Sequence, residues 1–217
     1  MSYFPLARDA LCLAMERRGW RIAMMPVVVL VLLAILQGCY LPESYKIDLS
    51  MTRQGDYQFS YQGLLVHPGL AEDLMAGEID SAAEQERADV VARDLGRDSG
   101  LKALVYRGQG VFDIRYERQG NIIADKTFSF VRRNAKILEM SYRQSENIVE
   151  IRGGFVPAQY RERLAAMGYK MQGEIEIRTE AGIRSHNAAS FDKTGDENRL
   201  RWAIESLDDP VPVLIIG

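Results

Sequence analysis

A run of fifteen uncharged residues near the start of the chain, Ile22 to Leu36, is the feature that most constrains the fold. Arg17, Arg18 and Arg21 precede this run, and Cys39 follows shortly after it. A helix that spans a bilayer needs about twenty apolar residues, whereas the apolar segment of a secretory signal needs only about 7 to 15. The run therefore predicts a cleaved signal, with an uncleaved signal anchor as the alternative. In both cases only the residues after it build the folded domain.

The end of the run reads Leu36, Gln37, Gly38, Cys39 and resembles the lipobox of bacterial lipoproteins. An aliphatic residue stands three positions before the cysteine, and a small residue stands directly before it. The resemblance implies that the thiol of Cys39 takes up diacylglycerol. It also implies that the mature protein is a lipid-anchored lipoprotein that carries palmitate. We therefore expect the protein in the cell envelope, attached to a membrane, with its domain outside the cytoplasm on the periplasmic face in a Gram-negative cell.

This signal divides the chain into three predicted parts. Residues 1–38 form the signal peptide, residues 39–44 hold the lipidated cysteine and a short tether, and residues 45–217 form a single envelope domain. About 180 residues are enough for one domain with its own core. Met15 stands immediately before a basic cluster, and we predict it as the true start of translation in place of Met1.

Charge and cysteine content exclude several classes of function. Residues 1–38 hold four of the 27 basic and two of the 30 acidic side chains, so residues 39–217 carry a formal charge of −5. A mildly acidic domain is not typical of nucleic-acid binding, nor of adhesion to an anionic membrane through a basic patch. Cys12 is lost with the signal and Cys39 is acylated, so the mature chain offers no disulfide, thiol nucleophile or cysteine-based metal site.

Alternating and helical patterns predict an α+β domain. Two strands form a first hairpin, a meander of strands runs from Leu101 to Ile151, and three more strands complete an antiparallel sheet. The strands outside the meander are expected at Tyr45–Thr52, Tyr57–Val66, Gly173–Thr179, Leu200–Glu205 and Val211–Ile216. Two main helices are expected, at Leu70–Leu95 with a weak join at Gly77, and from Pro157 to the glycine stop at Gly168.

Large apolar side chains recur on one face of these strands. They are Tyr57, Phe59, Tyr61, Phe112, Ile114, Phe128, Phe130 and Trp202. Buried Tyr and Trp need polar partners, and so many flat rings exceed what a small closed core usually holds. The pattern thus marks a candidate ligand wall, while an ordinary packed core is the default interpretation of large aromatics.

Motifs for catalysis and metal binding are weak. His67 and His186 are the only histidines, so a multi-histidine metal site is excluded, and His186 is a candidate base without an evident partner. Asp192, Asp196 and Glu197 are acidic enough to suggest calcium, but their spacing lacks the calcium-loop pattern and favours a hairpin turn. We expect no metal, no cofactor and no enzymatic activity.

The C-terminal third contains a distinctive series of segments. They are Gly173–Ile177, Ala181–Ala188, the polar loop with Gly195, and Leu200–Ile204. Together they resemble the LppM-like family of bacterial lipoproteins. Ala181 stands where the family usually has proline. The resemblance implies a lipid-anchored α+β domain with a role in binding envelope lipids or glycolipids, and it does not imply catalysis.

Three functions remain open from the sequence. The first is a non-enzymatic module that binds a lipid or another apolar ligand, and the second is a module that docks another envelope protein through a sheet edge or helix face. The third is an enzyme. A deep apolar pocket favours the first, a flat apolar patch favours the second, and convergent polar groups around His186 favour the third.

Overall fold

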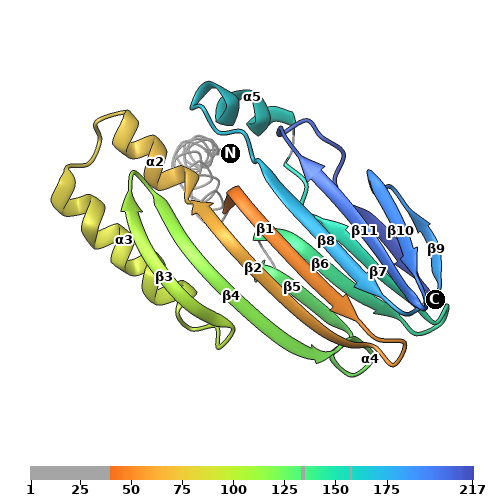
Figure 1. Cartoon of the computed structure of the whole chain (residues 1–217). Helices are drawn as coiled ribbons and strands as arrows, with labels where there is room; N and C mark the ends of the chain where they lie inside the picture. The colour runs from red at the N-terminus through yellow and green to blue at the C-terminus, as the bar shows by residue number, and fades with distance from the viewer. Residues whose placement is uncertain (1–39, 133–134, 157) are drawn as a thin grey trace, which may run out of the picture. The chain divides into compact units, whose positions relative to one another are not determined.

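The computed structural model describes residues 40–132, 135–156 and 158–217 (Figure 1). The predicted signal peptide, its lipobox and Cys39 lie outside the described residues. The strands are β1 (Leu41–Met51), β2 (Asp56–Val66), β3 (Leu101–Gly108), β4 (Val111–Asn121), β5 (Thr127–Arg132), β6 (Ala135–Arg143), β7 (Ile148–Gly153), β8 (Gly173–Thr179), β9 (Ile183–His186), β10 (Ser190–Thr194), β11 (Glu197–Ile204) and β12 (Val213–Ile216). The helices are α2 (Pro68–Met75), α3 (Ser81–Leu95), α4 (Ile122–Asp125) and α5 (Ala158–Ala166). The described domain is thus mixed α and β, as predicted, with strands predominating.

The strands form two sheets that pack face to face. One has seven strands in the order β10-β11-β8-β1-β2-β4-β3, and the other has five in the order β5-β6-β7-β12-β9. Rings from the two sheets meet between them, with the ring centre of Tyr61 4.7 Å from that of Phe130, and Phe59 5.0 Å from Phe128. In Figure 1, β5, β6 and β7 accordingly pass behind β1, β2 and β8. The core therefore lies between the sheets.

The prediction of one antiparallel sheet is only partly correct. The seven-stranded sheet contains a parallel pair, in which Ile47 on β1 stands opposite Ile175 on β8 and Leu49 stands opposite Ile177. Parallel neighbours need a long connection along the chain. Here all elements from β2 to α5 lie between β1 and β8 in the sequence. The alternation within a strand predicts its buried face but not its neighbour. The second sheet and the parallel pair therefore leave no local sign in the sequence.

The first strand begins earlier than predicted. β1 starts at Leu41, four residues before the expected start at Tyr45, and the Leu41 side chain is only 3 % exposed. A bulge between Glu43 and Lys46 interrupts the alternation, which hides the beginning of the strand from pattern reading. Residues 41–44, expected to be a tether, are therefore part of the sheet.

The long helix predicted at Leu70–Leu95 is two helices. Gly77, just after α2, has a φ of +69°, a conformation that ends a helix at little cost for glycine. Asp80 then caps the start of α3, because its carboxylate accepts hydrogen bonds from the backbone N–H groups of Ala82 and Ala83. The second predicted helix is present as α5.

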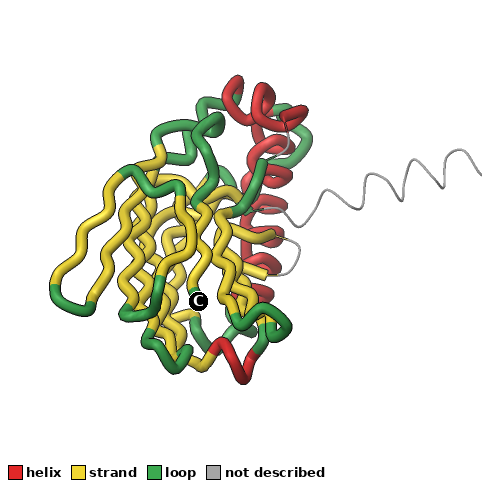
Figure 2. Tube along the Cα trace, turned by 90° about the vertical axis from the view of Figure 1, so that its right-hand side faces the viewer, coloured by secondary structure: helices red, strands yellow, loops and turns green. Residues whose placement is uncertain are grey.

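Helix α3 covers the part of the seven-stranded sheet that the smaller sheet leaves uncovered. Its Ala88 and Leu95 are buried in the same core as the strand residues, and the hydroxyl of Tyr106 on β3 donates to Glu84 on α3. Figure 2 shows the long helix running beside the strands on one side of the domain. The opposite, outer face of the seven-stranded sheet carries polar side chains.

The C-terminal region contains two short strands that the sequence does not reveal. β9 and β10 lie at the edges of the two sheets, and every side chain of β10 is exposed. An edge strand with both faces solvated has no apolar alternation to detect. The hairpin turn predicted around Gly195 is confirmed, because β10 and β11 pair on either side of it and Gly195 has a φ of +60°.

Candidate functional site

The residues of the candidate ligand wall lie in the core between the two sheets. Each is at most 6 % exposed, and together they come from β2, β4, β5 and β11. Their rings touch one another: the ring centre of Tyr57 is 5.4 Å from that of Phe128, and Phe59 is 5.2 Å from Phe130. These are contact distances for aromatic pairs. The rings in these pairs therefore pack directly against one another between the sheets. The eight residues placed there are Tyr57, Phe59, Tyr61, Phe112, Ile114, Phe128, Phe130 and Trp202.

The polar ends of the buried rings have partners inside the protein. The indole N–H of Trp202 donates to the side-chain oxygen of Asn187 at 2.9 Å, and the hydroxyl of Tyr61 donates to the carbonyl of Leu64 at 2.8 Å. Burial raises the pKa of Tyr61 well above its ordinary value, so its phenol stays neutral. Satisfied polar groups of this kind belong to a packed core.

His186, the candidate base, lies on the exposed edge strand β9. Its Nδ1 accepts a hydrogen bond from the backbone N–H of Ala188 at 3.2 Å, and its ring centre is 5.3 Å from that of Phe191. Neither contact is to a carboxylate or to a nucleophile. The geometry around His186 is therefore not that of a catalytic base held by an orienting acid.

The three acidic residues near the last hairpin pair with arginines. Asp192 is 3.0 Å from Arg201, Asp196 is 3.6 Å from Arg53, and Glu197 is 3.5 Å from Arg199. Over the described ranges, no group of three or more His, Cys, Asp and Glu side chains is placed to hold a metal ion. These carboxylates therefore take part in surface ion pairs.

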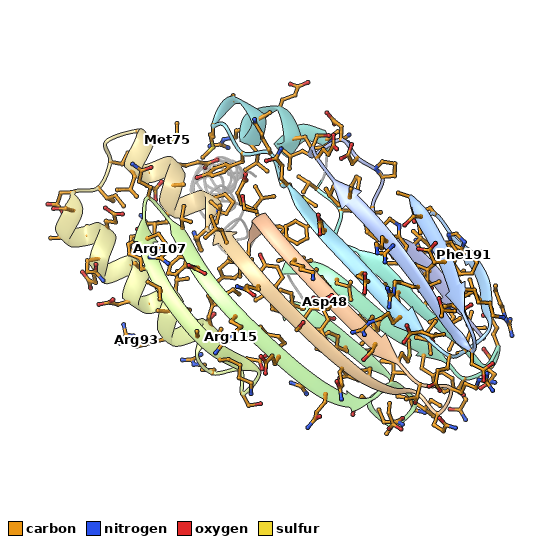
Figure 3. All side chains as sticks on the ribbon, viewed as in Figure 1. Asp48, Met75, Arg93, Arg107, Arg115 and Phe191 are labelled. Carbon is orange, nitrogen blue, oxygen red and sulfur yellow. The ribbon has the colours of Figure 1, made fainter. Side chains whose placement is uncertain are left out.

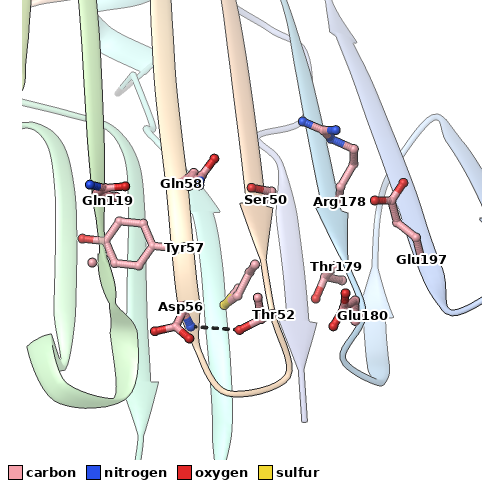
Figure 4. Close-up of a pocket in the computed structure, with 12 residues that line it drawn as sticks. Ser50, Thr52, Asp56, Tyr57, Gln58, Gln119, Arg178, Thr179, Glu180 and Glu197 are labelled. Atoms are coloured by element: carbon pink, nitrogen blue, oxygen red, sulfur yellow. Dashed lines mark hydrogen bonds between the residues drawn. The ribbon is translucent and has the colours of Figure 1, made fainter.

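A shallow depression of about 450 Å³ lies on the outer face of the seven-stranded sheet, close to the β1–β2 turn. Figure 4 shows Gln119, Gln58, Ser50 and Arg178 in a row across β4, β2, β1 and β8. The strand register creates this row, because Gln58 stands opposite both Gln119 and Ser50, and Ser50 stands opposite Arg178. Paired residues of neighbouring strands point to the same face.

The polar surface continues into a second depression of about 390 Å³. The two depressions share the row just described, and the second one also includes Asp48, Ser60 and Glu117. In Figure 3, Asp48 and Arg115 mark this face of the sheet. We call the combined surface the outer-sheet groove.

A cluster of arginines around Glu176 borders this groove. Partial burial opposes ionisation of Glu176, but a hydrogen bond from Arg201 and the positive charges of Arg199, Arg201 and Arg178 outweigh it. The net effect is to lower the pKa of Glu176 below its ordinary value. The Nε of Arg178 is 3.6 Å from a Glu176 oxygen and makes no hydrogen bond to a described residue.

The outer-sheet groove offers hydrogen bonding and charges of both signs. The row from Gln119 to Arg178 supplies two amides, a hydroxyl and a guanidinium, which include donors and acceptors. The charged side chains that line the rest of the groove are Asp48, Asp56, Lys102, Glu117, Arg118, Glu180 and Glu197. Within the described part of the chain, the side chains of Ser50, Gln58 and Gln119 are not used in hydrogen bonds to other residues. The sequence contained one sign of this face, the polar residues that alternate with the aromatics of β2, but not the neighbours that complete it.

No protein-family model and no curated protein matches the sequence. Among solved structures, the chain is similar to the NMR structure of the folded domain of LppM from Mycobacterium tuberculosis, with a TM-score of 0.35 and 11 % identity over 81 % of this chain and 91 % of that chain. None of the helices in the described ranges is long and apolar enough to cross a membrane.

Proposed function

We propose that this protein is a non-enzymatic envelope lipoprotein, anchored through acylated Cys39, whose domain docks another envelope protein at the outer-sheet groove. The anchor is supported by the charged, apolar and lipobox segments that precede the domain. The absence of enzymatic activity is part of the proposal, and it is supported by the contacts of His186, which include neither an acid nor a nucleophile.

The contact between the core aromatics is the observation that favours a surface function over an internal one. Binding a lipid inside the domain requires an apolar cavity of a few hundred Å³ or more. The rings expected to line it are packed against each other, with Tyr61 and Phe130 at 4.7 Å. The groove, in contrast, is lined by polar groups and open to solvent. Lipid binding inside the domain is therefore the second of the two alternatives.

The lining of the groove fits a protruding polar loop of a partner protein. The amides of Gln58 and Gln119 have the donors and acceptors to pair with a peptide backbone. Arg178 has the fork geometry that suits a carboxylate of the partner. A loop with one acidic side chain is thus the kind of partner surface we expect.

Site-specific photo-crosslinking of the full chain in its own cells tests the proposal. A photoreactive amino acid replaces Ser50 or Gln58 in the groove, and Ser129 serves as the matched control. Ser129 lies between Phe128 and Phe130, which face the core, so its side chain points to the outer face of the other sheet. We expect one discrete protein adduct at positions 50 and 58, none at 129, and loss of the adduct when Arg178→Glu is added.

Two results would contradict docking at the groove. Equal adducts at all three positions would show non-specific contact, and no adduct at positions 50 and 58 would show an unoccupied face. A lipid of fixed mass that stays with the protein in native mass spectra would instead support the lipid-binding alternative.

A further inference from the structure

The two most exposed large apolar side chains of the described residues are found at one end of the domain. Phe155 is 69 % exposed and Met75 is 67 % exposed. Met75 is the last residue of α2. Phe155 precedes Val156, which packs against a small apolar cluster that is separate from the main core. The buried members of that cluster are Leu41, Val66, Ala71 and Leu164. Both exposed side chains therefore belong to the end of the domain where β1 begins.

An ion pair connects helices α2 and α5 at this end of the domain. Arg163 on α5 lies 2.8 Å from Glu72 on α2. Figure 3 shows Met75 beside α2, well separated from Phe191 on the edge strand β10. We call this end, with α2, α5 and the segment around Phe155, the helical end.

The predicted lipid anchor is attached directly to the helical end. β1 begins at Leu41, and the ring of Tyr40 already packs edge-on against His67 at 5.7 Å. One residue therefore separates Cys39 from the buried start of the sheet, and consecutive Cα atoms are about 3.8 Å apart. Acyl chains on Cys39 would therefore hold this end of the domain close to the bilayer surface, because only Tyr40 stands between Cys39 and Leu41.

Three carboxylates at or near the helical end form ion pairs, whereas the exposed Glu78 and Glu162 form no ion pair with a described residue. Besides the pair between Glu72 and Arg163, Asp73 lies 2.5 Å from Arg87 and Arg161 lies 3.1 Å from Asp208. Paired carboxylates repel anionic headgroups less than free ones. These pairs reduce the electrostatic repulsion between the helical end and an anionic lipid surface.

We propose that the helical end rests on the membrane and that Met75 and Phe155 enter the headgroup region of the bilayer. The inference depends on the proposed anchor at Cys39 and adds the orientation of the domain to it. The transfer of exposed apolar side chains from water to a lipid interface lowers the free energy of the system. The anchor keeps them at high local concentration near the lipid, which favours this contact. The outer face of the seven-stranded sheet stays free for a partner.

Fluorescent labels on introduced cysteines test this orientation. Cys12 is removed with the signal and Cys39 is acylated, so a new cysteine is the only free thiol of the mature chain. The single variants are Met75→Cys and Phe155→Cys, with Ile123→Cys and Phe191→Cys as matched exposed controls. Ile123 belongs to α4, which follows the end of β4 paired with the β1–β2 turn and so lies at the opposite end of the strands.

Each full-length lipidated variant is labelled with an environment-sensitive thiol dye and placed in vesicles of phosphatidylethanolamine and phosphatidylglycerol. Labels at 75 and 155 should be quenched by spin-labelled lipid about threefold more than labels at 123 and 191, because apolar groups that enter the interface reach the boundary between headgroups and acyl chains. The same two labels should be protected from iodide in the water phase.

Palmitate labelling of the same preparations separates the anchor from the orientation. Palmitate uptake that is lost in Cys39→Ser, together with iodide quenching at 75 and 155 as strong as at 123, would overturn the orientation and leave the anchor standing. A wild-type chain that takes up no palmitate would overturn the anchor and the orientation together.

Discussion

At the scale of single residues, Trp202 distinguishes two interpretations of the aromatic set, a packed core and a ligand wall. Its side chain is 4 % exposed, and its N–H donates to Asn187, which also accepts from the backbone N–H of Val213 at 2.8 Å. Asn187 in turn donates to the carbonyl of Val211. The indole is therefore part of a hydrogen-bonded connection between β11, the loop after β9, and the segment that leads into β12.

We expect Trp202→Ala to lower the free energy of unfolding by about 3–5 kcal/mol, because it removes a large buried ring and leaves a cavity. Urea unfolding followed by circular dichroism measures the change. Trp202→Phe is the control, since it keeps an aromatic ring and loses the N–H bond, at an expected cost of about 1–3 kcal/mol. A loss below about 1 kcal/mol for the alanine variant would be too small for a core residue and would restore the ligand-wall interpretation.

At the scale of the elements, the bulge in β1 depends on a glycine in β2. Gly63 has a φ of +152°, and a Cβ atom there would lie 2.6 Å from the Cα of Tyr45 and 2.7 Å from the carbonyl oxygen of Ser44. Both atoms belong to backbone, which cannot move aside as a flexible side chain can. The close approach of β1 and β2 at this point therefore requires glycine.

Gly63→Ala should destabilise the domain by about 1–3 kcal/mol or more, through the unfavourable φ and the clash with β1. Gly77→Ala is a matched control, because its φ is also positive, at +69°, but a Cβ there meets nothing within 4 Å. Thermal unfolding of the two variants separates the cost of the positive φ, which both share, from the cost of the clash with β1, which only Gly63→Ala has. Equal shifts in melting temperature for both would show that the contact with β1 has no energetic consequence.

At the scale of the whole molecule, two carboxylates, Glu176 and Asp209, make the free energy of unfolding depend on pH in the acid range. The arginines around Glu176 lower its pKa against the opposing effect of partial burial. Hydrogen bonds from the backbone N–H groups of Glu205 and Ser206, with the Ser206 hydroxyl, lower the pKa of Asp209 against a smaller effect of burial. A carboxylate whose pKa is lowered by folding stabilises the folded state when ionised.

This contribution is complete above the ordinary pKa values of 4.5 for Glu and 3.8 for Asp, and it is lost as the pH falls through the lowered values in the folded state. We therefore expect the free energy of unfolding to fall below about pH 4.5. Glu176→Gln should make that fall less steep, while it lowers stability at pH 7. Urea titrations from pH 7 to pH 3 measure both effects, and identical slopes for variant and wild type would contradict the assignment.

The sequence by itself determined the local features of the chain. Polar and apolar residues alternate along β2 because successive side chains of a strand face opposite sides, so the buried aromatic set was identified before its surroundings were known. The mixed α and β class, helix α5 and the hairpin at Gly195 followed from equally local signals. The signal and lipobox are also linear motifs, and their role stays a prediction, because they lie outside the described residues.

Only the tertiary structure decided which strands meet. The parallel pairing of β1 with β8, the division into two sheets and the row from Gln119 to Arg178 join residues far apart in the chain. Pairing energy depends on both partners, so no single strand encodes it. The same limit applies to the aromatics: alternation shows that they face inward, but whether they enclose a cavity or fill the core depends on how closely the second sheet packs on the first.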